Sequence, residues 1–80
     1  MLGEGVELFS IPVPPSLSGR RLVDSGIGSR TGMSVIGSER DDVLGTQLTR
    51  ETPLDEGAVL LVLGSLEQRR KFAALFEAAR

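Results

Sequence analysis

The residues best suited to chemistry lie in one glycine-rich stretch, SGIGSRTGMSVIG, at positions 25 to 37. Hydroxyls, a guanidinium and the backbone amides of a turn are the groups that proteins use to hold small anions. Here such groups come from Ser29, Arg30, Thr31 and Ser34. We therefore predict that these residues bind a small anionic ligand held between two subunits, with an ordinary surface turn as the alternative.

The glycines of this stretch also invite comparison with a dinucleotide-binding loop. That loop has the pattern GxGxxG, follows a strand and opens a helix. Gly26 and Gly28 begin the pattern, but Gly32 comes one residue late, and the preceding segment has helical spacing. We predict instead that Gly26 ends a helix in a left-handed conformation and that Gly32 turns the chain into a strand.

Catalysis and metal binding have little support among the available side chains. The chain has no histidine and no cysteine, and its one lysine, Lys71, lies in a basic run with no serine at a diagnostic spacing. Glu39, Asp41 and Asp42 supply too few oxygen ligands for calcium, and we interpret them as a solvated hairpin turn. We predict no catalytic residue, no metal and no cofactor, and therefore no enzyme.

The composition is that of one small folded domain. Charged residues make up 25% of the 80 residues and apolar residues 40%, as in globular proteins. The net charge is -2, with no tryptophan, no tyrosine and only 3 phenylalanines, so a basic groove or a stacking platform for nucleic acid is not expected. The longest apolar run, residues 58 to 63, is far shorter than the roughly 20 residues that cross a membrane.

Three elements are predicted in the first half of the chain. An apolar segment near residues 5 to 12 predicts a strand, which the following prolines end. Ser16 or Ser18 then begins a helix whose apolar positions keep helical spacing up to Gly26. Residues 33 to 39 predict a second strand.

The second half begins with a predicted hairpin and a central strand. Residues 43 to 48 are the expected hairpin partner of the second strand, across a polar turn at residues 40 to 42. The continuous apolar run at residues 58 to 63 predicts a central strand that is covered on both faces.

The final helix starts at a capping box formed by Ser65 and Gln68. Its apolar stripe consists of Phe72, Leu75, Phe76 and Ala79. The order of elements is therefore β-α-β-β-β-α. This order predicts an α+β, two-layer domain with a small mixed sheet, at least one antiparallel hairpin and two helices.

Four stretches in this order resemble the C-terminal domain of TrkA-like regulators of potassium conductance, also called the RCK C-terminal domain. They are LFSIPV at 8 to 13, LSGRRL at 17 to 22, RTGMSVI at 30 to 36 and LDEGAVLLVLG at 54 to 64. The resemblance implies one regulatory domain over residues 1 to 80, a fragment of a larger protein. Such domains are usually attached to a nucleotide-binding domain, a channel or a transporter.

The resemblance also implies a dimer and, in some members, a ligand between the two copies. Members that bind cyclic di-AMP typically carry an arginine just after the first helix, an asparagine entering the second strand and a proline before the glycine-rich turn. The corresponding positions here are Gly28, Ser34 and Arg50, which all depart from that pattern. The arginine that pairs with phosphate and the amide that reads adenine are missing from their usual places.

We expect a cytoplasmic, dimerising regulatory domain of a potassium or other cation transport system, associated with a membrane protein. A homodimer needs an apolar surface, for which Val35, Ile36, Leu44 and Leu48 are the candidates, together with the final helix. Two alternatives remain open. The domain either responds to a small anionic ligand at the dimer interface, or it is a purely structural dimerisation module of a transporter without a ligand.

Overall fold

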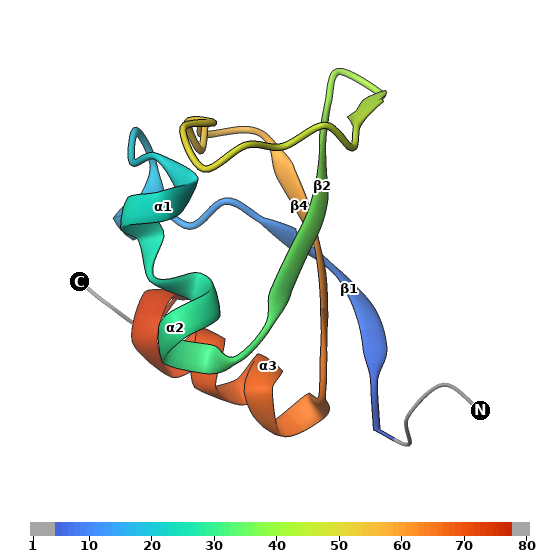
Figure 1. Ribbon diagram of the computed structural model, residues 1–80, viewed down its shortest axis with the longest axis vertical. Coiled ribbons are helices and arrows are strands. Elements are labelled where there is room, and N and C mark those ends of the chain that lie inside the picture. Colours follow the sequence, from blue (N-terminus) through green and yellow to red (C-terminus); the bar gives the residue numbers. More distant parts are fainter. Residues whose placement is uncertain (1–4, 78–80) are drawn as a thin grey trace.

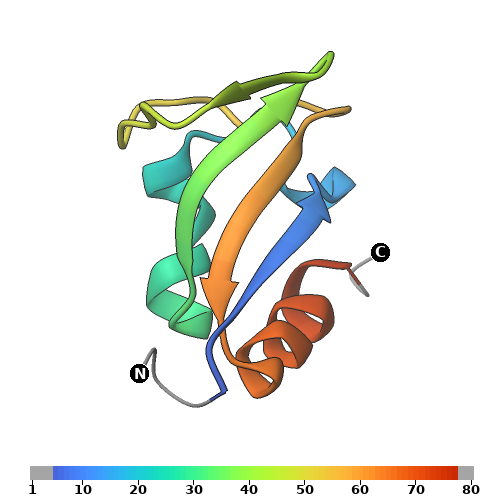
Figure 2. The ribbon, with the colours of Figure 1, turned by 90° about the vertical axis from the view of Figure 1, so that its right-hand side faces the viewer.

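The computed structural model describes residues 5–77, which form a four-stranded sheet with short helices on one side (Figures 1 and 2). The strands are β1 (Glu7–Pro12), β2 (Ser34–Arg40), β3 (Val43–Gly45) and β4 (Val59–Gly64), in the spatial order β1-β4-β2-β3. The helical elements are η1 (Pro15–Leu17), α1 (Leu22–Ser25), α2 (Ile27–Thr31), α3 (Leu66–Phe72) and η2 (Ala73–Glu77). The predicted α+β, two-layer architecture is confirmed.

The sheet is antiparallel throughout rather than mixed. A strand, helix and strand in succession often form neighbouring parallel strands, which is why a mixed sheet is expected from the sequence. Here β4 lies between β1 and β2 and runs antiparallel to both, so those two strands never pair with each other.

The central position of β4 is confirmed, but only one of its faces is covered within this chain. Leu60 and Val62 are 1% and 0% exposed, whereas Leu61 and Leu63, which alternate with them, are only half-buried. The prediction that both faces are covered is therefore wrong for the single chain. An apolar run indicates that both faces avoid water, but it does not say whether the same chain supplies both covers.

The predicted first helix is broken into η1, α1 and α2. Three glycines with positive φ interrupt or end these pieces: Gly19 at +85°, Gly26 at +75° and Gly32 at +82°. A left-handed residue stops a helix because it cannot continue the hydrogen-bond ladder, and glycine adopts it without a steric cost. The predicted roles of Gly26 and Gly32 are confirmed, since they follow α1 and α2 directly.

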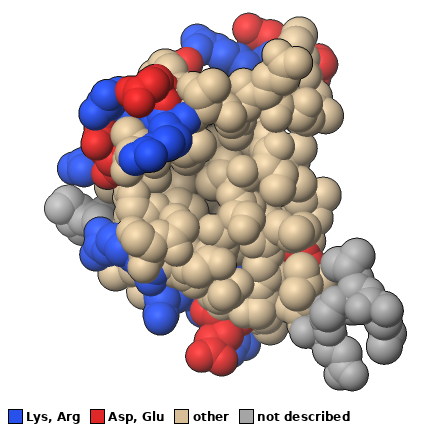
Figure 3. All heavy atoms as spheres, viewed as in Figure 1, with Lys and Arg blue, Asp and Glu red and all other residues tan. Residues whose placement is uncertain are grey.

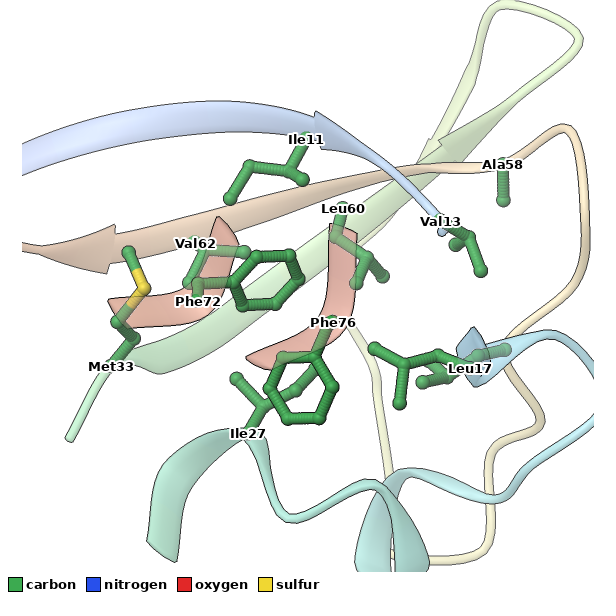
Figure 4. Close-up of a cluster of buried hydrophobic side chains, with 11 residues drawn as sticks. Ile11, Val13, Leu17, Ile27, Met33, Ala58, Leu60, Val62, Phe72 and Phe76 are labelled. Atoms are coloured by element: carbon green, nitrogen blue, oxygen red, sulfur yellow. The ribbon is translucent and has the colours of Figure 1, made fainter. Parts of the chain in front are cut away.

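One hydrophobic core lies between the sheet and the helices (Figure 4). Phe72 and Phe76 form its centre, with ring centroids 4.9 Å apart and planes inclined at 57°. This tilted arrangement is a favourable geometry for aromatic pairs. Figure 4 shows the two rings among side chains of β1, β4, α2 and η1: Ile11, Leu60, Val62, Ile27 and Leu17.

The start of α3 is the predicted capping box. The Ser65 hydroxyl accepts a hydrogen bond from the Gln68 amide at 3.1 Å, and the Gln68 side chain accepts one from the Ser65 amide at 2.9 Å. After Phe72 the backbone continues as the π-helical turn η2, and the Ser16 hydroxyl donates to the Phe76 carbonyl at 2.7 Å. Within the predicted apolar stripe Leu75 is half-buried, and Ala79 lies outside the described residues.

The hairpin partner of β2 is shorter than predicted, because β3 ends at Gly45 rather than at residue 48. The chain then leaves the sheet and runs to α1, where backbone hydrogen bonds join Thr52 to Leu22 at 2.8 Å and Arg50 to Val23 at 2.9 Å. The Arg21 guanidinium donates to Glu51 across this junction and to Asp24 within α1. The hydrogen bond to Asp24 is the main cause that raises the pKa of Arg21 above its ordinary value.

Candidate functional site

Two of the predicted ligand-binding residues use their hydroxyls locally. The Thr31 side chain is buried, donates to the Ile27 carbonyl at 2.5 Å and accepts from the Met33 amide at 3.1 Å. The Ser29 hydroxyl is exposed and lies 3.4 Å from the Gly26 carbonyl. Thr31 therefore fixes the turn between α2 and β2, since both of its hydrogen-bonding functions are occupied.

The other two predicted residues point to different parts of the molecule. The Arg30 guanidinium lies 5.5 Å from the centroid of the Phe76 ring, a cation–π contact, and lines a hollow with Ser16, Arg20 and Leu75. Ser34 is exposed at the start of β2, opposite Leu63. The structure does not bring the four residues into one site. Ser29, Arg30 and Thr31 are consecutive on α2 and so point in different directions around the helix, while Ser34 lies on β2.

A hollow of about 270 Å³ does lie beside the glycine-rich turn. Its lining combines apolar side chains with turn backbone: Leu22, Val23, Ser25, Gly26, Ile27, Gly28, Ser29, Met33 and Val35. None of these side chains carries a charge, so within residues 5–77 the hollow offers an anion only hydroxyl and amide groups. Gly28, the position at which the family resemblance implies a ligand-binding arginine in some members, lies in its wall.

The side of the sheet that faces away from the helices is largely apolar, with Ser34 and Glu39 as its polar residues on β2. On this outer face Leu8 pairs with Leu63, while the side chains of Leu44 and Leu61 both approach Gly37. Leu8 is 56% exposed, Leu44 52%, and Ile36, the extra residue of a β-bulge in β2, 44%. We use the name outer face for these apolar residues: Leu8, Ile36, Leu44, Leu61 and Leu63.

The distribution of charged side chains also distinguishes the two sides of the sheet. Figure 3 shows Lys, Arg, Asp and Glu gathered mainly over the helices and the hairpin tip, while the sheet side between the hairpin and the residues drawn in grey is almost uncharged. Single exposed apolar residues are normal on a protein surface, but several adjoining ones without charges mark an interaction site.

The predicted dimer residues are divided between two surfaces. Ile36 and Leu44 lie on the outer face. Val35 pairs with the buried Val62 and packs against the core, and Leu48 lines a hollow on the helical side of the sheet. The outer-face residues Leu8, Leu61 and Leu63 are not among the sequence candidates. Alternation along β1 and β4 is the signal that could have found them, since their neighbours Phe9 and Val62 face the core.

The acidic group near the hairpin does not form a metal site. Asp41 and Asp42 have φ values of 53° and 65° and make the two-residue turn between β2 and β3. No group of three or more possible metal ligands gathers within residues 5–77.

In the same part of the chain, no helix has the length and apolar character that spanning a bilayer requires.

Residues 6–77 match the family model of the TrkA-C domain. The chain therefore belongs to the TrkA-C domain family, a family of regulatory rather than catalytic domains, and the resemblance inferred from the sequence is confirmed. Among solved structures, the RCK domain of GsuK is 31% identical over 95% of this chain, with a TM-score of 0.81. The chain spans only 17% of that protein's length. No match is found among curated proteins.

Two more distant structures share the fold. The RCK C domain of the potassium transport protein KtrA, in complex with cyclic di-AMP, is 16% identical over 94% of this chain and 88% of that one, with a TM-score of 0.83. An RCK_C domain dimer of S. agalactiae BusR, also with cyclic di-AMP, is 12% identical over 90% of this chain and 97% of that one, with a TM-score of 0.77. The domain is thus of the type found in potassium channels and potassium transport proteins.

The prediction that nucleic acid is not a partner needs a correction. BusR has also been solved with its promoter DNA, and this chain covers 41% of that BusR chain. A protein that carries a domain of this fold can therefore bind DNA, so the exclusion of nucleic acid from the composition extends at most to the surface of this domain and not to the protein that contains it.

Proposed function

We propose that this chain is a self-associating regulatory domain of a potassium transport system, which works in the cytoplasm beside a membrane channel, a transporter or a nucleotide-binding domain. Family membership supports the regulatory class. The observation that supports self-association is the outer face, an apolar surface on the uncovered side of the central strand, with the charged Glu39 beside Leu44 at its hairpin end.

Pairing of two outer faces explains why β4 is apolar throughout. A domain of this size buries only about 60% of the surface that its unfolded chain exposes. With all helices on one side, half of the β4 side chains stay partly in water unless a second layer covers them. A second copy provides that layer with the same side chains, since a two-fold interface uses one patch twice.

Self-association allows regulation through a shift of populations. A dimer with two arrangements responds to any ligand or partner that binds one arrangement more tightly, and the attached gate follows. Such a ligand shifts the equilibrium only by its difference in affinity for the two arrangements. The domain itself therefore needs no catalytic group.

The small ligand is a separate part of the proposal. The domains of KtrA and BusR were solved with cyclic di-AMP, and the whole GsuK channel with NAD. In this chain Gly28, Ser34 and Arg50 stand at the positions where the family resemblance implies cyclic di-AMP-binding residues, and the nearby hollow lacks charged side chains. We therefore propose that the domain formed by this chain dimerises without cyclic di-AMP.

A melting-temperature screen separates a ligand-responsive domain from a purely structural module. A ligand at 100 times its dissociation constant stabilises a folded protein by about 2.7 kcal/mol, which is readily seen for a small domain. We expect no shift with cyclic di-AMP. A clear shift with that dinucleotide would overturn this part, and a shift with another nucleotide would make the domain ligand-responsive.

Self-association is tested by light scattering on three variants. Leu44→Asp and Leu61→Asp place a charge on the outer face and should convert a dimer into a monomer, because an unpaired charge at a dry interface is costly. Leu66→Asp is the matched control, since Leu66 is 50% exposed on α3 and is not one of the outer-face residues. Circular dichroism checks that each variant is folded. A wild-type monomer at all concentrations, or dimers in both outer-face variants, would contradict the proposal.

A further inference from the structure

A second hollow, which the proposed function does not use, lies on the helical side of the sheet. It measures about 150 Å³ and is enclosed by the ends of β1, β2 and β4 and by the segment after β3. Its apolar lining consists of Val13, Leu22, Leu48, Pro53, Leu54, Ala58 and Leu60. Val13 and Ala58 lie at the end of the core opposite Met33, and Leu60 lies between them and the two phenylalanine rings (Figure 4). Leu22 is the only residue that it shares with the hollow beside the glycine-rich turn.

The wall of this hollow is held by hydrogen bonds. The Thr52 amide donates to the Thr49 carbonyl at 3.1 Å, and the Thr52 hydroxyl accepts from the Thr49 amide at 2.9 Å. The Thr52 carbonyl in turn accepts from the Leu22 amide at 2.8 Å. The hollow is therefore formed before any ligand binds, which lowers the entropy cost of binding.

Opposite charges stand side by side in its lining. A nitrogen of the Arg40 guanidinium lies 3.0 Å from one oxygen of the Asp55 carboxylate, and both residues line the hollow. Their side chains are 58% and 48% exposed, so the pair is screened and contributes little to stability. Guanidinium has five N–H donors and a carboxylate has two acceptor oxygens, so each partner keeps free positions. The Ser38 side chain belongs to the same lining.

We propose that this hollow binds a free α-amino acid with a branched or aromatic apolar side chain. The ligand carboxylate pairs with Arg40, its ammonium group pairs with Asp55, and its side chain enters the apolar part. The whole hollow measures about 150 Å³, and a cavity of that volume holds benzene, which is close in size to a leucine or phenylalanine side chain. The ligand side chain therefore fills the hollow, while its two charged groups stay outside at the exposed pair of Arg40 and Asp55.

The two charges also determine which related molecules are rejected. A simple carboxylate with the same apolar body leaves Asp55 facing an anion, and a simple amine leaves Arg40 facing a cation. Only a ligand with both charges satisfies both residues, and the discrimination comes largely from the repulsive contacts. Glycine has both charges but nothing to fill the cavity.

The proposal is tested by methyl NMR on the whole chain, with L-leucine and L-phenylalanine as probes. We expect either probe to shift the methyl signals of Leu48, Leu54 and Leu60. Glycine, 4-methylpentanoate and 3-methylbutylamine should bind about tenfold more weakly or worse. Equal binding of leucine and 4-methylpentanoate, no response to either probe, or shifts confined to the outer face would overturn the proposal.

Two charge variants make the test sharper. Asp55→Asn should weaken leucine binding and at the same time improve binding of 4-methylpentanoate, because the repulsion is removed. Arg40→Gln should likewise weaken leucine binding and improve binding of 3-methylbutylamine, because the repulsion between Arg40 and the amine is removed. Glu56→Gln and Arg70→Gln are matched controls on exposed residues outside the hollow and should change neither preference. Dimerisation uses the outer face, so light scattering reports on it independently.

Discussion

At the scale of single residues, Gly32 shows how one position serves two elements. Its φ of +82° ends α2, and a Cβ there would lie 2.7 Å from the Gln68 side chain that caps α3. Gly32→Ala therefore combines a strained backbone, about 1 to 3 kcal/mol, with disturbance of the cap. We expect it to lower the free energy of unfolding in urea by more than either effect alone.

Gly19→Ala is the matched control for this prediction. Gly19 has a φ of +85°, but a Cβ there would meet nothing within 4 Å. It therefore carries the backbone strain without the contact to Gln68. If the two variants lose the same stability, the proposed coupling between α2 and the cap of α3 does not exist.

The side chain on which the core depends most is Phe72. It is 0% exposed and packs against Phe76. Phe72→Ala removes a buried ring and should cost about 3 to 5 kcal/mol. The total stability of a native domain is about 5 to 15 kcal/mol, so chemical denaturation should show a marginally folded protein. Leu66→Ala on the same helix, at a 50% exposed position, should stay within about 0.5 kcal/mol of the wild type.

At the scale of elements, the start of α3 is set by two reciprocal hydrogen bonds. Ser65→Ala removes the acceptor for the Gln68 amide and should destabilise the domain by about 1 kcal/mol. In a double-mutant cycle with Gln68→Ala the two losses should not add, because both belong to one cap. Ser18→Ala, at an exposed serine that is not part of the capping box, is the control. Additive losses in the cycle would show that the bonds act separately.

At the scale of the whole molecule, a sheet covered on one side predicts that stability depends on protein concentration. If the folded state is a dimer and the unfolded state is not, raising the concentration favours folding, by about 1.4 kcal/mol for each factor of ten. We expect the melting temperature to rise with concentration in calorimetry. Leu44→Asp should melt at a temperature that does not depend on concentration, whereas Leu66→Asp should behave like the wild type.

The sequence alone determined the elements whose signals are local. Glycines at 26 and 32 end helices because of their own backbone freedom, and Ser65 with Gln68 caps a helix through groups only three residues apart. The apolar run at residues 58 to 63 identifies the central strand, again through a signal contained in one short stretch of sequence. The family, too, could be inferred, since it rests on the order of such local signals.

Only the tertiary structure decided which side chains meet. Arg30 and Ser34 are four residues apart in sequence, yet one lies over Phe76 and the other at the start of β2, opposite Leu63. Arg40 and Asp55, which are 15 residues apart, form a pair that no spacing indicated. Periodicity reports that a side chain avoids water, but its direction and its partner depend on how distant elements pack, and that is settled by the burial of one shared core.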